Sequence, residues 1–249
     1  MWLIGRIICP VFQVSNVTGE GINLFKMFLN LLPNTVQFDN DKELEISIDR
    51  TFKVAGVGTV VSGIVMNGTI KVNDTINLGP DYAGKFHLVQ VKSLHSKRLK
   101  VEEISSGYSA GIALKKVKRD DIRRGMILCS KKMTIQCCYD FVASLVILHH
   151  PSTISIGYQG MLNVDNIRQS VQLIEMDKPL LRTGDKATVI FRFIMFPEAL
   201  KEGSRIIFRE GKTKAFGKIK KIIPYIHGEP VPVCLSKAKL AKIRREKTT

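Results

Sequence analysis

The sequence predicts a mainly β protein in which two consecutive β-barrels follow a short α/β segment. Short runs of alternating apolar and polar residues fill residues 43–131, and a second set of runs extends from about residue 138 to residue 223. Turn-forming residue pairs separate the runs, and no long helical period interrupts either set. Two successive all-β blocks of this kind are typical of two small barrels.

Residues 1–34 differ from the rest of the chain and form the α/β segment. Residues 10–15 predict a short buried strand. Apolar side chains then recur at helical spacing over residues 22–32, and Pro33 ends this period. A strand that passes through a glycine-containing turn into a helix is typical of the last part of an α/β domain. The polar residues 34–42 predict a linker.

The first barrel is predicted at residues 43–131. Its most informative stretch is residues 56–68, which read G-V-G-T-V-V-S-G-I-V-M-N-G. Gly56 and Gly58 supply backbone freedom, and a β-branched run follows them. The pair Asn67-Gly68 predicts a two-residue hairpin turn.

The second barrel is predicted at residues 136–224. Its expected strands include residues 141–148, 171–176, 187–193, 205–209 and 216–223. Residues 225–249 lose this alternation and are rich in Lys and Arg, which predicts a mobile basic tail.

The positive charge of the chain is concentrated in two stretches. The net charge is +16. Residues 92–124 hold ten Lys and Arg against four acidic residues, and residues 201–249 hold fourteen against four, so these stretches contribute +6 and +10. Clustered positive charge indicates a polyanionic partner such as nucleic acid. The alternative is a solvated basic surface without a partner.

Cysteine usage and hydropathy indicate the compartment. The five cysteines are an odd number without C-x-x-C spacing, which favours a reducing compartment over a disulfide framework or a zinc site. The apolar N-terminal residues are interrupted by Arg6 and Pro10, so they make a poor signal peptide. No apolar run is long enough to cross a membrane as a helix. We therefore expect a cytoplasmic protein, monomeric and without membrane contact.

Several stretches resemble catalytic or metal motifs but fail on inspection. Residues 79–86 nearly match the phosphate loop G-x-x-x-x-G-K-S/T, but Phe86 cannot place a hydroxyl on magnesium. We interpret them as a hairpin loop. Neither Cys137-Cys138 nor His149-His150 can chelate a metal from one side of a strand, because adjacent residues point to opposite faces. We therefore predict no metal site, and no arrangement stands out for hydrolysis.

Residues 15–21 form a loop between the predicted strand and helix. They read S-N-V-T-G-E-G. Backbone N–H groups at the start of a helix can donate to an acceptor on a ligand. The alternative is an ordinary capped helix, in which the hydroxyl of Ser15 or Thr18 accepts bonds from free amides.

Taken together, these motifs resemble one family. The residues that carry the likeness are 9–10, 15–19, 56–63, 92–95, 114–116, 148–155, 182–187 and 208–215. The chain is similar over residues 8–223 to the GTP-binding protein 1 and 2 branch of the elongation-factor-Tu-like translational GTPases. The resemblance implies a remnant of a GTP-binding domain followed by the second and third β-barrels of such a factor.

The resemblance also implies partners and a cofactor. The parent proteins would bind GTP or GDP with Mg²⁺, and their barrels would hold tRNA and engage the ribosome. The guanine base would contact Ser15, Asn16 and Val17. The family's phosphate loop, D-x-x-G switch and N-K-x-D motif precede the part that this chain matches. We therefore expect no GTP hydrolysis by residues 1–249 alone, and no tight nucleotide binding.

The resemblance implies an RNA-binding site on each barrel. On the first barrel, Phe52 and the loop with Lys97 and Arg98 would lie near the aminoacylated 3′ end of tRNA, and His95 replaces the acidic residue usual in that loop. On the third domain of elongation factors, the tRNA stem makes the contacts. The corresponding candidates here are Arg168, Arg209, Lys212 and Lys214.

A second hypothesis stays open on the sequence alone. The barrels would then form a protein-interaction module, or a nonspecific RNA-binding module without GTP control, with a basic tail that only increases solubility. The sequence does not choose between elongation, ribosome rescue and mRNA turnover as the role of the parent protein.

Overall fold

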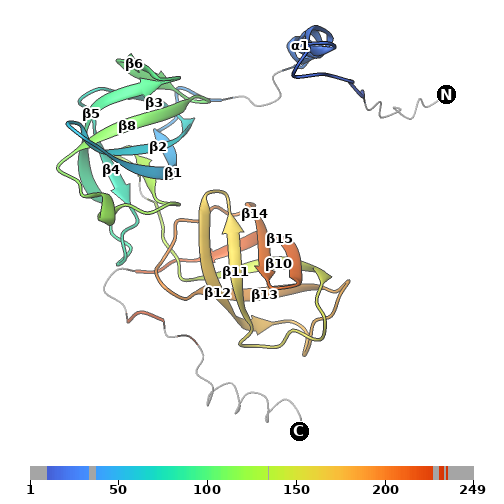
Figure 1. Ribbon diagram of the computed structural model, residues 1–249. Helices are drawn as coiled ribbons and strands as arrows, with labels where there is room; N and C mark the ends of the chain where they lie inside the picture. The colour runs from blue at the N-terminus through green and yellow to red at the C-terminus, as the bar shows by residue number, and fades with distance from the viewer. Residues whose placement is uncertain (1–9, 34–37, 134, 227–229, 233, 235–249) are drawn as a thin grey trace. The chain divides into compact units, whose positions relative to one another are not determined.

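The computed structural model describes residues 10–33, 38–133, 135–226, 230–232 and 234. The chain divides into two compact units, Met1–Gln37 and Phe38–Thr249. Figure 1 shows a helix in the described part of the first unit and the β-barrels of the second. The fold class predicted from the sequence, two consecutive barrels preceded by an α/β remnant, is thus confirmed.

The first unit contains helix α1 (Ile22–Leu31). Phe12 packs against Phe25 and Phe28 of this helix, with ring centroids 5.5 and 5.1 Å apart. The strand predicted at residues 10–15 is wrong, because the structure assigns no strand there and leaves Val11 exposed. A β-strand needs a neighbouring strand for its backbone bonds, and the described part of this unit contains none.

Strands β1 to β9 and a short 3-10 helix make up the first barrel. Their bounds are β1 (Glu45–Val54), β2 (Gly58–Asn67), β3 (Thr69–Lys71), β4 (Thr75–Gly79), β5 (His87–Ser96), β6 (Leu99–Val101), β7 (Glu103–Ser105), β8 (Ser109–Lys115), η1 (Arg119–Asp121) and β9 (Ile127–Cys129). The sheet runs in the order β4-β9-β1-β2-β8-β5, and pairing of β4 with β5 closes it. Strand β6 extends β5, and β3 pairs with β7 alone.

The turn residues in the sequence predict one hairpin loop of this barrel correctly and another wrongly. Residues 80–86 connect the antiparallel strands β4 and β5, as expected for a hairpin loop. Asn67-Gly68 is not a hairpin turn, because β2 pairs with β1 and β8 and not with β3. Gly68 has a φ of 72° and donates its backbone N–H to the Asp39 carbonyl, which lies before β1. Tertiary pairing therefore overrides the local turn signal.

Strands β10 to β15 form the second barrel. Their bounds are β10 (Asp140–His149), β11 (Gln159–Val164), β12 (Ile167–Met176), β13 (Lys186–Phe193), β14 (Arg205–Glu210) and β15 (Thr213–Ile223). They close in the order β10-β13-β12-β11-β14-β15. Four buried phenylalanines fill the interior: Phe141, Phe191, Phe193 and Phe208. Strand β11 was not among the strands named from the sequence.

Polar contacts join the two barrels. Arg123, just before β9, donates from Nη1 to Oε1 of Glu198 in the second barrel (2.6 Å). Gln169 Nε2 donates to the same oxygen (2.9 Å). Lys201 Nζ lies 2.6 Å from Oε2 of Glu45 on β1. The Glu198 side chain is 2% exposed, so its contact with Arg123 lies in the protein interior.

The ends of the predicted domains are only partly described. The barrel strands fall within the predicted ranges 43–131 and 136–224, and the boundaries themselves stay predictions. Tyr225, the first residue of the predicted tail, donates its backbone N–H to the Cys137 carbonyl (2.7 Å) and packs edge-on against Tyr139. Most of the remaining tail lies outside the described residues. Among the helices of the described part, none is long and apolar enough to cross a membrane.

Candidate nucleic-acid interface

One row of side chains crosses the outer face of the first barrel. Strand register places Phe52 opposite Val60, Val60 opposite Ala113, and Ala113 opposite Ser93. The residues that alternate with this row on the same strands, such as Val61 and Leu114, belong to the barrel core. Side chains alternate between the two faces of a strand, so the row faces outward. Phe52 is 44% exposed, whereas Ala113 further along the row is 2% exposed.

A second outward row runs parallel to the first. It contains Arg50, Ser62, Gly111, His95 and Lys100, each opposite the next. The two rows are separated by two residues along each strand, which is about 7 Å. We call the two rows the outer platform, and its members are Phe52, Val60, Ala113, Ser93, Arg50, Ser62, Gly111, His95 and Lys100. The platform is an aromatic ring beside a floor of small residues, and cations lie along its edges.

The turn after β5 adds two cations beside the platform. Lys97 and Arg98 connect Ser96 to Leu99 in a two-residue hairpin, with φ values of 50° and 69°. Both values lie in the left-handed region that Asn and Gly occupy more readily, so this turn is strained. Lys97 Nζ lies 5.7 Å from the centroid of the Tyr108 ring. Strained backbone of this kind is concentrated at functional sites.

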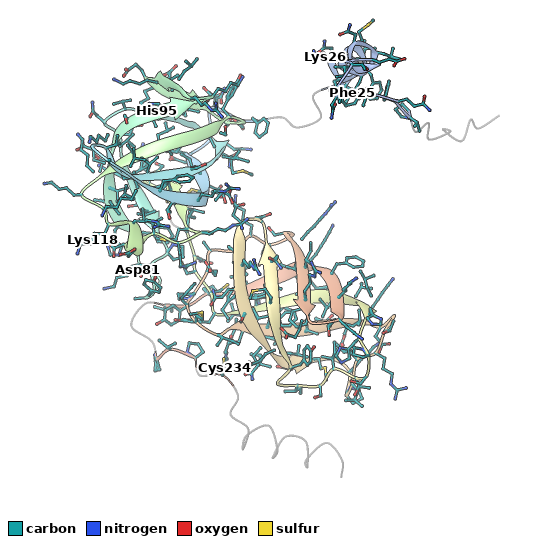
Figure 2. All side chains as sticks on the ribbon, in the orientation of Figure 1. Phe25, Lys26, Asp81, His95, Lys118 and Cys234 are labelled. Atoms are coloured by element: carbon teal, nitrogen blue, oxygen red, sulfur yellow. The ribbon has the colours of Figure 1, made fainter. Side chains whose placement is uncertain are left out.

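The structure places all four site residues predicted on the first barrel on one outer face: His95 lies next to the Lys97-Arg98 turn, whereas Phe52 lies three strands away, at roughly 16 Å by strand spacing. Figure 2 labels His95 there, and His95 lies two residues from the Lys97-Arg98 turn. Phe52 lies on the same outer face, in the neighbouring row. Sequence reasoning missed the small floor formed by Ser62, Gly111 and Ala113. The signal was present as small residues at alternate positions of β8, but only strand register shows that they lie beside Phe52.

Three of the four cations predicted on the second barrel also gather. Arg209 on β14 lies opposite Lys214 on β15, and Lys212 is in the turn between them. Arg168 lies two strands away and one outward row further, at roughly 12 Å by strand spacing. None of these four cations forms an ion pair with another described residue. They are therefore available to bind phosphates.

A buried network fixes the turn that carries Lys212 and Lys214. The Thr213 hydroxyl is 2.7 Å from His150 Nδ1 and 2.9 Å from the Tyr158 hydroxyl. Thr213 is 1% exposed, so these hydrogen bonds fix the backbone that carries Lys212 and Lys214. The neighbouring His149 lies opposite Lys214 and points to the other face of the strand.

The guanine contact predicted in the first unit has a local structure of its own. Ser15 Oγ accepts the backbone N–H of Thr18 (3.2 Å), and the Ser15 N–H donates to the Glu20 carbonyl (3.0 Å). Ser15 therefore stabilises a turn before the helix; the alternative of a helix capped by Ser15 or Thr18 is wrong, because Gly21 occupies the N-cap and no side chain caps α1. The roles of Ser15, Asn16 and Val17 toward a nucleotide stay predictions.

The described cysteines and histidines form no metal-binding cluster. In the part of the chain that the structure describes, no three of His, Cys, Asp and Glu gather at a possible metal site. Burial raises the pKa of the Cys137 thiol to about 12, so this thiol stays protonated near neutral pH. Cys138 is likewise a buried free cysteine.

Comparisons with known proteins assign this arrangement to a family. Residues 58–129 match the family described as elongation factor Tu domain 2. GTP-binding protein 1 of Xenopus laevis is 48% identical over 223 residues, which cover 90% of this chain and 34% of that protein. GTP-binding protein 2 of Mus musculus is 36% identical over 228 residues, 89% of this chain and 38% of that protein. Elongation factor 1-alpha of Pyrobaculum islandicum is 31% identical over 145 residues, 58% of this chain and 32% of that protein.

The chain thus spans about a third of the length of the curated relatives it matches. Its two barrels, its matched second-domain region and these identities agree with one another. The chain belongs to the elongation-factor-Tu-like translational GTPases, in the branch of GTP-binding proteins 1 and 2, and corresponds to their C-terminal portion.

Proposed function

We propose that this chain is the RNA-engaging portion of a GTP-controlled translation factor. The outer platform receives the aminoacylated 3′ end of a tRNA, and the cations of the second barrel contact its stem. The observation that carries the proposal is the placement of Phe52 beside a floor of small residues, with cations along the edge, on one outward face.

The chemistry of the outer platform suits a single-stranded end of RNA. An aromatic ring stacks on any base, and the small side chain of Ser62 and the absence of one at Gly111 let the base approach the strands closely. Arg50, Lys97 and Arg98 then supply charge for the phosphates. No member of the platform is acidic, and His95 stands where a carboxylate is usual in elongation factors. The preference for an aminoacylated end is therefore a separate question for experiment.

The role of the whole protein follows from its relatives and belongs to the same proposal. A GTP-binding domain in the parent protein holds GTP or GDP with Mg²⁺, and residues 15–17 contribute to the guanine contact. The barrels change partners under the control of that domain, with tRNA and the ribosome as partners in the cytoplasm. Residues 1–249 by themselves bind no nucleotide tightly and hydrolyse no GTP.

Substitution of Phe52 tests the proposal directly. We expect Phe52→Ala to weaken tRNA binding by about tenfold or more, because loss of one stacked base costs about 1–3 kcal/mol. The matched control is Leu88→Ala, which removes another exposed apolar side chain from the same barrel and should leave the affinity unchanged. Binding is measured with aminoacylated and with deacylated tRNA on the full chain.

Either of two results would contradict the platform. One is an equal affinity for Phe52→Ala and Leu88→Ala. The other is an absence of tRNA binding by the unmodified chain, which would favour the second candidate, a protein-interaction module. That candidate has its own observation, since Ile207 and Phe216 lie opposite each other on β14 and β15 and are both about half exposed.

A further inference from the structure

A hollow lies at one end of the first barrel, beyond the Phe52 row of the outer platform. It has a volume of about 840 Å³ and opens between the β1–β2 turn and the chain that leaves β8. Figure 2 shows Lys118, which lines it, at the end of the barrel opposite His95. A volume of this size is typical of sites that hold a small molecule. No member of the outer platform lines the hollow, although Lys53 and Lys92 adjoin the platform residues Phe52 and Ser93 in the chain.

The lining of this hollow carries an excess of positive charge. Six cations line it: Lys53, Lys92, Lys115, Lys116, Lys118 and Arg119. Asp120 is the one acidic residue of the lining, so the net charge is +5 from six positive and one negative side chain. Among the described residues, none of the seven belongs to an ion pair. Like charges held close together repel one another, and a bound anion would relieve this repulsion.

Two of these lysines, Lys92 and Lys116, lie where the backbone is irregular. The register between β5 and β8 shifts between Val91 and Ser93, so Lys92 is the extra residue of a bulge. A bulge re-aims the side chain that it carries. Lys116 has a φ of 58°, in a region where non-glycine residues are uncommon. The chain thus adopts two strained or irregular conformations at the two places where it presents a lysine to the hollow.

Hydrogen bonds hold the walls in place and leave donors for a ligand. Thr59 Oγ1 donates to the Val117 carbonyl (2.7 Å), which ties the loop after β8 to β2. Lys92 Nζ donates to the Val57 carbonyl (2.8 Å). Lys115 Nζ donates to Gln90 Oε1 (3.2 Å) and to Asn73 Oδ1 (3.4 Å). An ammonium group has three donors, so both lysines keep at least one for a ligand.

We propose that this hollow binds closely spaced phosphate groups. Lysine is a common phosphate ligand and acts as a point charge, and five of the six cations are lysines. The dense charge within one hollow suits a ligand with two or more linked phosphates better than a single carboxylate. The phosphates can belong to a small polyphosphate or to an RNA. The inference does not depend on the proposed function, because no member of the outer platform lines the hollow.

Inorganic tripolyphosphate is the probe that tests this site. Its binding to the full chain is measured by isothermal titration calorimetry at about 150 mM salt. We expect saturable one-to-one binding that weakens by about tenfold or more in Lys116→Gln/Lys118→Gln, because the variant removes two charged hydrogen-bond donors for the phosphates. The matched control is Lys131→Gln/Lys132→Gln, which removes two exposed lysines that line a different hollow and should bind as the unmodified chain does.

Two results would overturn the inference: no saturable binding by the unmodified chain, or an equal loss in the two double variants. Thermal unfolding of each variant checks that it is folded. Where the site binds, competition identifies the source of the phosphates: if RNA occupies the hollow, tripolyphosphate displaces tRNA from the unmodified chain at lower concentration than from Lys116→Gln/Lys118→Gln, whereas equal displacement from both indicates a small polyphosphate. Phe52→Ala should bind tripolyphosphate normally, so failure of the platform and failure of the hollow are separate outcomes.

Discussion

At the scale of single residues, Glu198 shows how a buried carboxylate connects the barrels. Its Oε1 accepts bonds from Arg123 and Gln169, whereas its Oε2 is buried without a hydrogen-bond partner among the described residues. Burial raises the pKa of Glu198 above its ordinary value, and the neighbouring Arg123 and Gln169 oppose this only in part. The carboxylate is therefore incompletely compensated in the folded state.

This raised pKa predicts the pH dependence of stability. Glu198 binds its proton more tightly in the folded state than in the unfolded state, so its contribution to stability is complete below about pH 4.5 and is lost as the pH rises through the folded-state pKa. We expect the free energy of unfolding to fall relative to that of Glu198→Gln as the pH is raised from about 4.5 toward 8. Urea unfolding at several pH values measures it.

The control for the Glu198 experiment is Glu175→Gln, which changes an exposed glutamate on β12. A difference between the unmodified chain and Glu198→Gln that stays constant, or that grows in favour of the unmodified chain at higher pH, would contradict the prediction. Such a result would mean that Arg123 lowers the pKa of Glu198 more than burial raises it.

At the scale of a strand, β15 depends on a glycine. A Cβ atom at Gly217 would overlap the Ser144 carbonyl oxygen of the neighbouring β10. We expect Gly217→Ala to lower the free energy of unfolding by about 1–3 kcal/mol, because a backbone atom cannot move aside as a side chain can. Chemical denaturation of the full chain measures the change.

Gly111 on β8 is the control for Gly217. A Cβ there would meet its nearest neighbours, atoms of His95, at 3.6 and 3.8 Å, which is ordinary contact. Gly111→Ala should therefore cost little stability or even stabilise the strand. Equal losses in the two variants would show that close packing of β15 on β10 is not the cause.

The pair Arg209 and Lys214 predicts opposite effects on stability and binding. Like charges directly opposite each other on neighbouring strands are destabilising. We expect Lys214→Gln to raise the free energy of unfolding by about 0.5 kcal/mol and to weaken tRNA binding. Parallel urea and tRNA titrations measure both.

Lys71 supplies the comparison, since it lies opposite Glu103 and its Nζ is 3.1 Å from Glu103 Oε2. Lys71→Gln should not stabilise the chain. If Lys214→Gln lowers the free energy of unfolding, as Lys71→Gln can, then the second-barrel cations stabilise the fold and are not a surface that binds a polyanion.

At the scale of the whole molecule, charge predicts a steep salt dependence. The net charge is +16, and the platform edge and the second barrel provide at least six cations for phosphates. Six or more phosphate contacts predict an affinity loss on the order of a thousandfold between about 50 and 200 mM salt. A plot of binding constant against salt concentration for the full chain measures the slope. A shallow slope would mean that the charge serves solubility alone.

Much of the fold could be predicted, because strand alternation and turn residues are local signals. The strand at residues 10–15 was predicted wrongly because its apolar residues say nothing about whether a partner strand is present. The turn at Asn67-Gly68 was predicted wrongly because β1 and β8 compete for the edges of β2. On the candidate site, the sequence indicated Phe52 and the 97–98 loop through a resemblance, and it did not indicate the floor between them.

The sequence by itself determined the fold class, the family likeness and the position of the charged stretches, because each depends on residues close together in the sequence. Tertiary structure decided which distant residues share a face. Phe52 and His95 share one outer face through the register of four strands, and Lys53 and Lys118 line one hollow because β1, β2 and β8 lie side by side in the sheet. Arg123 and Glu198 meet because two barrels pack. Register, closure and packing are nonlocal, so no window of the sequence expresses them.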